Sequence, residues 1–332
     1  MRGVRDDVLE AVSALRRGGL VGLPTETVYG LGADASNELA VRRIFAVKGR
    51  PSRHPLIVHV ACADDARRLA AAWPDEAGVL ARAFWPGPLT LVVTRASAVS
   101  DAVTGGQDTV GLRVPDHPLA LELLSTFGGG VAAPSANRFG RVSPTTAQHV
   151  RDELGADVDV VLDGGPCRVG VESTIVDLSR GAPRVLRPGG VPREALEAAL
   201  GAPVPVVTTA TDVRAPGLLA SHYAPRAGLS LVSAEALAGE AGRRLRDGAT
   251  VAALVPAASP TPAGVVRFEV AGDDAAYARA LYATLREVDA RGLDVVLAVP
   301  PPATGVGLAV VDRLRRASAP RAPPDDEGHG AR

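Results

Sequence analysis

The chain has 332 residues, of which 46% are hydrophobic and 22% charged, a composition typical of a globular protein with two domains. Its formal net charge of −1 creates no overall field that would attract nucleic acids or acidic membranes, and no apolar run approaches the ~20 residues that span a bilayer. Cys62 and Cys167 form no paired motif and the charged N-terminus is not a signal peptide. We therefore expect a cytoplasmic protein without structural disulfides.

Helical and strand patterns alternate over residues 1–205, which we expect to form one α/β domain. Apolar residues at helical spacing predict helices over 4–15, 37–48, 64–72, 75–84, 118–126, 144–154 and 193–200. Apolar runs predict strands over 20–23, 56–60, 89–94, 109–114, 131–133, 158–162, 174–178 and 184–186. The glycine-rich stretch 24–32 is expected to be a connection, and Ser143 is expected to cap the helix that begins at Pro144.

The composition changes in the last third of the chain. Proline, valine, threonine and alanine with little periodicity predict a linker over 206–228. Strands expected at 229–232, 250–255, 265–270 and 294–299, with helices at 234–245, 273–290 and 307–317, predict a small Rossmann-like α/β domain over 229–318. The proline-rich, charged segment 319–332 is expected to be a disordered tail.

Lys48 is the only lysine among the 36 basic side chains, and Arg50 follows it closely. A lysine is a compact point charge and an arginine is a flat fork of donors, so a site with both shapes suits a polyphosphate. His54, between the same helix and the next strand, adds a third donor for phosphate oxygens. A solvated helix end that contains a lysine by chance explains Lys48 equally well.

Other polar positions are candidates for a binding site. Arg113 lies inside an apolar strand and needs an anion, which is more often a carboxylate of the protein than one of a substrate. Ser135 and Asn137 follow a strand in a loop held by Pro134, where function often concentrates, although a simple turn is the commoner explanation. His59 lies within a strand, and such a residue is more often a core histidine whose hydrogen bonds are made.

Several common catalytic patterns are weak or missing. Gly30–Ala35 matches the loose dinucleotide fingerprint, but the tight turn and the acidic residue for the ribose are lacking. The only lysine lacks the glycines of a phosphate-binding Walker loop. No Ser/His/Asp triad, metal cluster or carboxylate pair stands out. We therefore expect a site that positions substrates and neutralises charge, with no covalent nucleophile and no metal held by the protein.

A set of short motifs in a fixed order resembles the YrdC-type threonylcarbamoyl-AMP synthases over about residues 5–200. The motifs are Leu23-Pro24-Thr25-Glu26-Thr27-Val28-Tyr29-Gly30-Leu31-Gly32, Lys48-Gly49-Arg50-Pro51, His54-Pro55-Leu56, Trp85-Pro86-Gly87-Pro88-Leu89-Thr90, Pro134-Ser135-Ala136-Asn137, Ser143-Pro144-Thr145 and Glu172-Ser173-Thr174. Ser221-His222-Tyr223-Ala224-Pro225, with the runs 277–285 and 307–316, resembles the longer, two-domain branch of that family.

The resemblance implies both a fold and a reaction. The fold is a twisted mixed α/β sheet with a large, positively lined cavity. In the reaction, L-threonine, bicarbonate and ATP give threonylcarbamoyl-AMP and pyrophosphate, with Mg²⁺ on the triphosphate of ATP. A partner transferase then moves the threonylcarbamoyl group to an adenosine next to the anticodon of certain tRNAs. Direct binding of tRNA by this chain is left open.

The resemblance also assigns roles to residues. Lys48, Arg50, Ser135 and Asn137 match the family's Lys-x-Arg and Ser-x-Asn signature, and Lys48 and Arg50 become the catalytic residues that stabilise charge on the α-phosphate. The residues implied to bind ATP are Arg50, His54, Thr109, Ser135, Asn137, Ser143, Arg187, His222 and Tyr223. Those implied to bind threonine are Thr27, His59, Arg113, Ser173 and, through its backbone, Ala133.

The linker has features of its own. It carries His222 and Tyr223 side by side, whereas a pure spacer needs neither an imidazole nor a phenol. A labile adenylate must be protected from water, so we expect the linker to act as a lid over the nucleotide. The other interpretation is that both side chains only anchor the second domain.

Three rival functions follow from the same sequence. A double-stranded RNA-binding module without adenylate synthesis is opposed by the net charge of −1. A carbamoyltransferase of the hydrogenase-maturation type would carry cysteine-rich zinc segments, and the two isolated cysteines exclude it. A dinucleotide oxidoreductase is weakened by the missing acid for the ribose.

Overall fold

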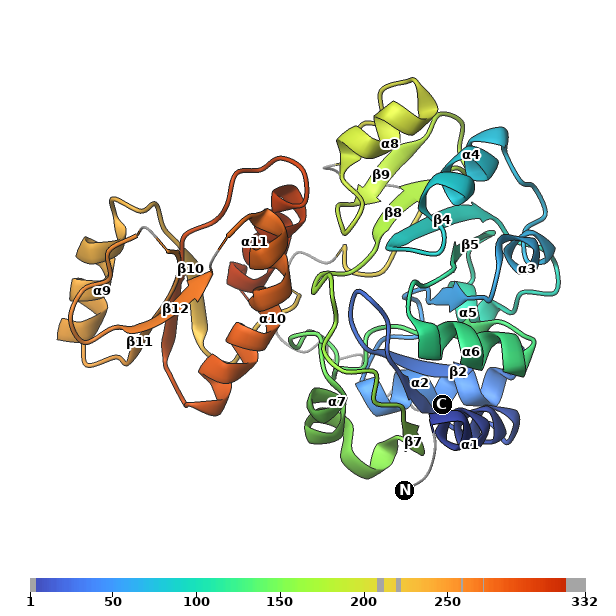
Figure 1. Ribbon diagram of the computed structural model, residues 1–332, viewed down its shortest axis with the longest axis horizontal. Helices are drawn as coiled ribbons and strands as arrows, with labels where there is room; N and C mark the ends of the chain where they lie inside the picture. The colour runs from blue at the N-terminus through green and yellow to red at the C-terminus, as the bar shows by residue number, and fades with distance from the viewer. Residues whose placement is uncertain (1–3, 208–211, 219–221, 258, 271, 321–332) are drawn as a thin grey trace, which may run out of the picture.

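The computed structural model describes residues 4–207, 212–218, 222–257, 259–270 and 272–320. In Figure 1 a larger N-terminal domain lies beside a smaller C-terminal one, and the chain passes between them through the linker. Within the described ranges, no helix has both the length and the apolar character that crossing a membrane would require. Most of the expected tail, from residue 321 onward, lies outside the described residues.

The N-terminal domain is built on a nine-stranded mixed sheet. Three pairs of neighbouring strands run parallel, β7 with β1, β3 with β5 and β4 with β8, and the others run antiparallel. In sheet order the strands are β7 (Val160–Val161), β1 (Val21–Leu23), β2 (Gly30–Asp34), β6 (Val131–Ala132), β3 (Ile57–His59), β5 (Thr109–Arg113), β4 (Leu89–Thr94), β8 (Thr174–Asp177) and β9 (Arg184–Arg187). The expected twisted mixed sheet is confirmed.

Helices cover both faces of this sheet, except for part of one face that carries the cavity described below. α1 and α6 pack with β1 and β6, while α2, α4, α7 and α8 pack on the opposite face. The helical segments are α1 (Val4–Arg16), α2 (Glu38–Lys48), α3 (Ala63–Arg68), α4 (Asp75–Phe84), α5 (Asp101–Thr104), α6 (Pro118–Phe127), α7 (Ala147–Leu154), the 3₁₀ turn η1 (Gly155–Asp157) and α8 (Arg193–Leu200).

Three elements differ from the sequence prediction. β2 occupies part of the stretch expected to be a connection, because its glycines let it pass close to β6: a Cβ on Gly32 would lie 2.9 Å from Val131 Cγ1. α7 begins at Ala147 and is capped by the Thr146 side chain, so the expected cap at Ser143 is wrong. The short helix α5 was not predicted from the sequence.

The C-terminal domain confirms the expected small α/β fold. Its four strands are all parallel, in the order β10 (Gly228–Leu231), β13 (Val295–Ala298), β11 (Val251–Pro256) and β12 (Val266–Val270). α9 (Leu237–Arg246) covers one face, whereas α10 (Asp274–Ala290) and α11 (Gly307–Ser318) cover the other, which is turned toward the larger domain (Figure 1).

The two domains share one apolar cluster. Val142 and Val171 of the N-terminal domain pack in the same buried cluster as Tyr282 of α10 and Leu314 of α11. Tyr223 of the linker belongs to this cluster as well. The domains therefore share an apolar contact, and Val171 joins it just before the start of β8.

Candidate functional site

A cavity lies over the free part of one sheet face, and its wall is strongly basic. Three arginines, Arg50, Arg113 and Arg187, line it together with His59 and His222. Its volume is about 50 Å³, because Pro216, Gly217, His222 and Tyr223 of the linker form part of its wall. The arginines agree with the expected positive lining, whereas the expected large size is not found in this structure.

The strands of the sheet bring the first site residues together. Ile57 and His59 are two positions apart in β3 and therefore point to the same face. β3 and β5 are parallel, and their register pairs His59 with Arg113. The last residues of both strands thus place an imidazole and a guanidinium on one wall of the cavity.

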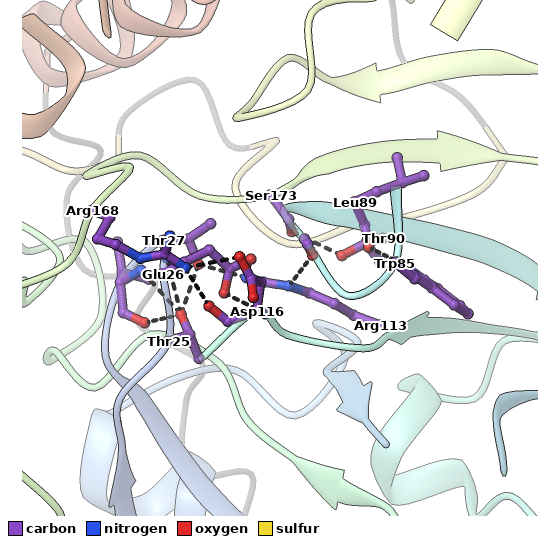
Figure 2. A network of polar contacts seen from close by, with 12 residues as sticks. Thr25, Glu26, Thr27, Trp85, Leu89, Thr90, Arg113, Asp116, Arg168 and Ser173 are labelled. Carbon is purple, nitrogen blue, oxygen red and sulfur yellow. Dashed lines mark hydrogen bonds and ion pairs between the residues drawn. The ribbon is translucent and has the colours of Figure 1, made fainter. Parts of the chain in front are cut away.

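Arg113 is oriented by a set of buried partners that Figure 2 shows together. Its Nη2 donates to Glu26 Oε1 at 2.6 Å and to Thr27 Oγ1 at 3.0 Å, and its Nε donates to the Gly87 carbonyl at 3.2 Å. Glu26 Oε2 accepts from the Asp116 N–H at 3.0 Å. The commoner of the two alternatives for Arg113, a carboxylate of the protein, is therefore present. These bonds use Nε and Nη2 of a side chain that has five donors.

His59 remains neutral in this environment. Burial, together with the charge of Arg113, lowers its pKa to about 3. Among the described residues its Nδ1 has no hydrogen-bond partner, although the side chain is buried. A neutral imidazole with an open nitrogen on the cavity wall can accept or donate one hydrogen bond to a ligand.

Ser173 and Arg187 join the sheet to the linker. Ser173 Oγ and Thr90 Oγ1 lie 2.8 Å apart in a hydrogen bond between adjacent strands (Figure 2). Arg187 Nη2 donates to the Ser173 carbonyl at 2.9 Å, and its Nη1 donates to the Pro216 carbonyl at 3.0 Å. The linker is thus bound by a residue of the cavity wall.

Lys48 is the last residue of α2, and Gly49 ends the helix in the left-handed conformation with φ 60°. The ammonium is buried and donates to the Ser135 carbonyl at 2.5 Å and to the Asn137 carbonyl. Burial, and then the charge of Arg50, lower its pKa well below the usual value. Two of its three N–H groups therefore hold the Ser135–Asn137 loop, and one remains.

Arg50 lies directly on the cavity. Its Nη2 donates to the Pro55 carbonyl at 3.0 Å, and its Nε has no partner among the described residues. Its guanidinium lies 5.9 Å from the ring centre of Phe139, which also contacts His54 and His222 edge to face. Burial, followed by the opposing effects of Tyr223 and Arg187, lowers its pKa to about 10, so it stays charged.

The linker closes over the cavity with an unusual backbone. Tyr223 has φ 62°, a left-handed conformation that is costly for a residue with a side chain. A Cβ on Gly217 would lie only 2.1 Å from its hydroxyl oxygen. His222 is buried beside it, and burial with the charge of Arg50 lowers the pKa of His222 to about 3.

Most of the residues proposed from the sequence lie on the cavity wall, and some do not. Those on the wall are Thr27, Arg50, His59, Arg113, Ala133, Ser135, Ser173, Arg187, His222 and Tyr223. Those behind or beside it are Lys48, His54, Thr109, Asn137 and Ser143. Thr109 lines a neighbouring hollow with Arg214 and Pro216, and Ser143 donates to Glu172 at 2.7 Å.

Sequence reasoning missed the groups that hold these residues. Glu26 and Glu172 stand inside motifs that were recognised, yet no role was given to either carboxylate. Arg313 and Tyr282 lie on helices of the other domain and were not singled out. A basic residue on the apolar face of a predicted helix is the signal that would have revealed Arg313.

The described residues contain no group of three or more His, Cys, Asp or Glu side chains that could hold a metal ion. The carboxylates near the cavity are already used by arginines, as in Glu26 with Arg113 and Glu172 with Arg313. The oxygen donors that Mg²⁺ prefers would therefore have to come mainly from a ligand such as a triphosphate.

Two family models match almost the whole chain. The Sua5/YciO/YrdC model, described as telomere recombination, matches residues 13–189. A second model, described as the C-terminal domain of threonylcarbamoyl-AMP synthase, matches residues 191–319. The boundary between the two matches lies before the linker.

Several relatives resemble this chain over nearly its full length. The threonylcarbamoyl-AMP synthase of Pyrococcus abyssi is 41% identical over 323 residues, which are 94% of each chain. That of Bacillus subtilis is 40% identical over 327 residues, covering 95% of this chain and 93% of the relative. The crystal structure of P. abyssi Sua5 complexed with L-threonine superposes with a TM-score of 0.90 at 39% identity, covering 96% of this chain and 95% of that one.

Proposed function

This chain belongs to the Sua5/YciO/YrdC family, in the two-domain form of the threonylcarbamoyl-AMP synthases, and from that premise we propose how its cavity performs the synthesis. The reaction joins L-threonine, bicarbonate and ATP into threonylcarbamoyl-AMP and pyrophosphate. The observation that carries the proposal is the basic wall, on which His59 is paired in register with Arg113 and Arg187 acts electrostatically on Arg50. We assign the first pair to one end of the site and the second pair to the other.

The Arg113 end binds threonine. Its Nη1 takes no part in the hydrogen bonds to Glu26, Thr27 and Gly87, and the fixed fork offers it to the threonine carboxylate. Glu26 keeps the guanidinium oriented, so little ordering is lost when the ligand binds. The open Nδ1 of His59 and the Ser173 hydroxyl complete the polar groups around the amino acid.

The Arg50 end binds the nucleotide, with Ser135 and Arg187 on the same wall. The amine of threonine first adds to bicarbonate, with loss of water, to give a carbamate. A carbamate oxygen then attacks the α-phosphorus, and the bond from that phosphorus to the bridging oxygen breaks so that pyrophosphate leaves. Arg50 and the remaining N–H of Lys48 stabilise the charge that collects on the α-phosphate oxygens.

Mg²⁺ is expected to arrive bound to the triphosphate oxygens and is treated as part of the ATP substrate. The product is labile, and a partner transferase that acts on tRNA consumes it. We place this work in the cytoplasm, where ATP and tRNA are available.

The linker is a lid in this proposal. With Pro216, Gly217, His222 and Tyr223 on the wall the cavity is about 50 Å³, which is far too small for ATP. The linker must therefore move aside when ATP binds, and a second closed position, over the bound adenylate, would exclude water from it. Cleavage by a protease near residues 214–226 should accordingly become slower when ATP and threonine are both present.

One assay tests the central claim. The protein is incubated with ATP, threonine, Mg²⁺ and labelled bicarbonate, and the labelled adenylate is separated from pyrophosphate. Equal amounts of both products, dependent on threonine, are expected. Pyrophosphate without label in the adenylate would contradict the proposed reaction, and binding of double-stranded RNA tighter than binding of ATP would favour the rival function.

A further inference from the structure

Glu172 differs from the other residues of the cavity wall because its main partners come from the other domain. Arg313 Nε of α11 donates to its Oε2 at 2.7 Å, and the Tyr282 hydroxyl of α10 donates to the same oxygen at 2.9 Å. Its Oε1 accepts from the Ser143 hydroxyl at 2.7 Å. One carboxylate thus connects two helices of the C-terminal domain to a residue expected to bind ATP.

Arg313 is engaged on every side. Its Nη1 donates to Asp312 at 2.6 Å and its Nη2 to the Pro188 carbonyl at 3.1 Å, while its guanidinium carbon lies 5.0 Å from the ring centre of Tyr223. The residue is 1% exposed and is among the largest fully buried side chains of the described chain. Arg313 therefore contacts the catalytic domain and the linker at the same time.

Stability alone does not explain this arrangement. Taking two charges out of water costs about as much as their attraction returns, and a well-packed apolar contact would hold two domains equally well. The surroundings of Glu172 and Arg313 already provide such a contact in Val171 and Leu314. The ion pair beside the cavity is better explained by an effect on the ligand that binds in the cavity.

The charge of Glu172 also has to be compensated before an anion can approach. Burial alone would raise its pKa, but the charges of Arg313 and Arg187 and the hydrogen bond from Ser143 hold it at about 2. The carboxylate is therefore ionised, and without Arg313 it would repel a triphosphate. Tyr223, Tyr282 and His222 are the other titratable groups that face it.

We propose that Glu172 and Arg313 are positioning residues of the reaction, through which the C-terminal domain fixes the Tyr223 ring at the nucleotide end of the cavity and the Ser143 hydroxyl behind its wall. This rests on the proposed function, since it takes that end to be the ATP site. At the threonine end Arg113 itself takes no partner from the C-terminal domain, because Glu26, Thr27 and Gly87, which hold it, all belong to the catalytic domain.

The test compares the two substrates in the same variants. Arg313→Lys keeps the charge but loses the fork, and Glu172→Gln keeps the shape but loses the charge. Both should raise the KM for ATP about 10- to 100-fold, the value of one hydrogen bond to a charged group, and change the KM for threonine less than about twofold. Tyr282→Phe, which removes only a hydroxyl, should act in the same direction and more weakly.

Glu240→Gln is the control. Glu240 forms an ion pair with Arg244 Nε at 2.8 Å on α9, which covers the face of the C-terminal sheet opposite to α10 and α11. Loss of this pair should leave both KM values unchanged. Thermal unfolding of each variant shows which of them are folded at the assay temperature. If Arg313→Lys does not fold, Glu172→Gln and Tyr282→Phe decide the question.

Two results would overturn the proposal. An unchanged KM for ATP in folded variants would mean that the ion pair only joins the domains. An equal rise of both KM values would mean a general loosening of the site. Failure of the proposed function is a separate result, since the wild-type protein would then make no threonylcarbamoyl-AMP at all.

Discussion

The two buried arginine–glutamate pairs beside the cavity are built in different ways. Arg113 and Glu26 lie 2.6 Å apart within the catalytic domain, where the end of a strand meets the connection between β1 and β2. Arg313 and Glu172 lie 2.7 Å apart across the domain boundary. The first pair is made by the sheet itself, and the second exists only while the C-terminal domain is docked.

The difference indicates how support for the two substrates is divided between the domains. The groups that hold Arg113 at the threonine end all belong to the catalytic domain. The nucleotide end takes partners from α10, α11 and the linker, and of these the linker must move to admit ATP. A site whose two ends are held by different domains can keep one substrate in place while it opens for the other.

The largest effect is expected at Lys48, which lies behind the cavity wall and is influenced by the charge of Arg50. Lys48→Ala should lower kcat about 100- to 1000-fold, because a preorganised donor to the transferring phosphate is lost, while both KM values change little. Lys48→Arg should also be poor, since a planar fork does not replace a point charge. The measurement is pyrophosphate release at saturating ATP and threonine, with circular dichroism as the check on folding.

A different result for Lys48 would change its role. Its ammonium holds the Ser135 and Asn137 carbonyls, so it could act only by shaping that loop. In that case Lys48→Ala would raise the KM for ATP and leave kcat near the wild-type value.

The second effect tests the threonine end of the comparison. Arg113→Lys should weaken threonine binding about 10- to 100-fold, since the charged contact from Nη1 and the bonds that orient it are lost, and should leave ATP binding within about twofold. Calorimetric titration of each ligand separately measures this. Equal loss of both ligands would show that Arg113 supports the whole cavity and that the two ends are not independent.

The sequence patterns predicted most of the strands and helices but few of the side-chain contacts between them. Most strands and helices have local apolar periodicity, and they formed close to the expected ranges. β2 was hidden because its glycines, which its close approach to β6 requires, resemble a loop in sequence. The resemblance assigned Arg113, His59 and Arg187 to the site, and all three lie on one wall. The register of β3 with β5 brings His59 and Arg113 together.

The second pair could not be predicted in this way. Arg313 and Glu172 are 141 residues apart, and neither belongs to a pattern that specifies the other. The docking of α11 against the catalytic domain depends on the summed fit of Val142, Val171 and their neighbours, which a single sequence does not encode in any local signal.

The third effect concerns the linker side of the nucleotide end. Gly217→Ala places a methyl group 2.1 Å from the Tyr223 hydroxyl oxygen at a backbone φ of 81°. We expect the KM for ATP to fall by up to about 10-fold, because the linker position that leaves no room for ATP is strained by about 1–2 kcal/mol. Gly248→Ala is the control: its φ is 83° and nothing lies within 4 Å of the added Cβ. Similar kinetics for the two variants would mean that this linker position does not compete with ATP.

The smallest effect is a dependence of the free energy of unfolding on pH. One histidine at each end of the cavity contributes to it. His59 lies beside Arg113 and His222 lies beside Arg50, and burial with these charges lowers both pKa values to about 3. An unfolded histidine takes up a proton near pH 6.5, whereas these two do not while the protein is folded. The folded state therefore binds fewer protons, and the free energy of unfolding must fall as the pH drops from about 6.5 toward 3.

The slope of the free energy of unfolding against pH distinguishes the contribution of the histidines from that of Glu172. Each histidine contributes about 1.4 kcal/mol per pH unit well below pH 6.5. Glu172 has a lowered pKa of about 2, so its stabilisation is complete above its unfolded pKa near 4.5 and is lost only below that value. Urea unfolding between pH 4.5 and 6 thus reports on the histidines. His222→Gln should remove about 1.4 kcal/mol per pH unit from the slope, and so should His59→Gln. If only His59→Gln does so, the linker end is open to water and His222 is protonated in the folded protein, which would place the weaker closure at the nucleotide end.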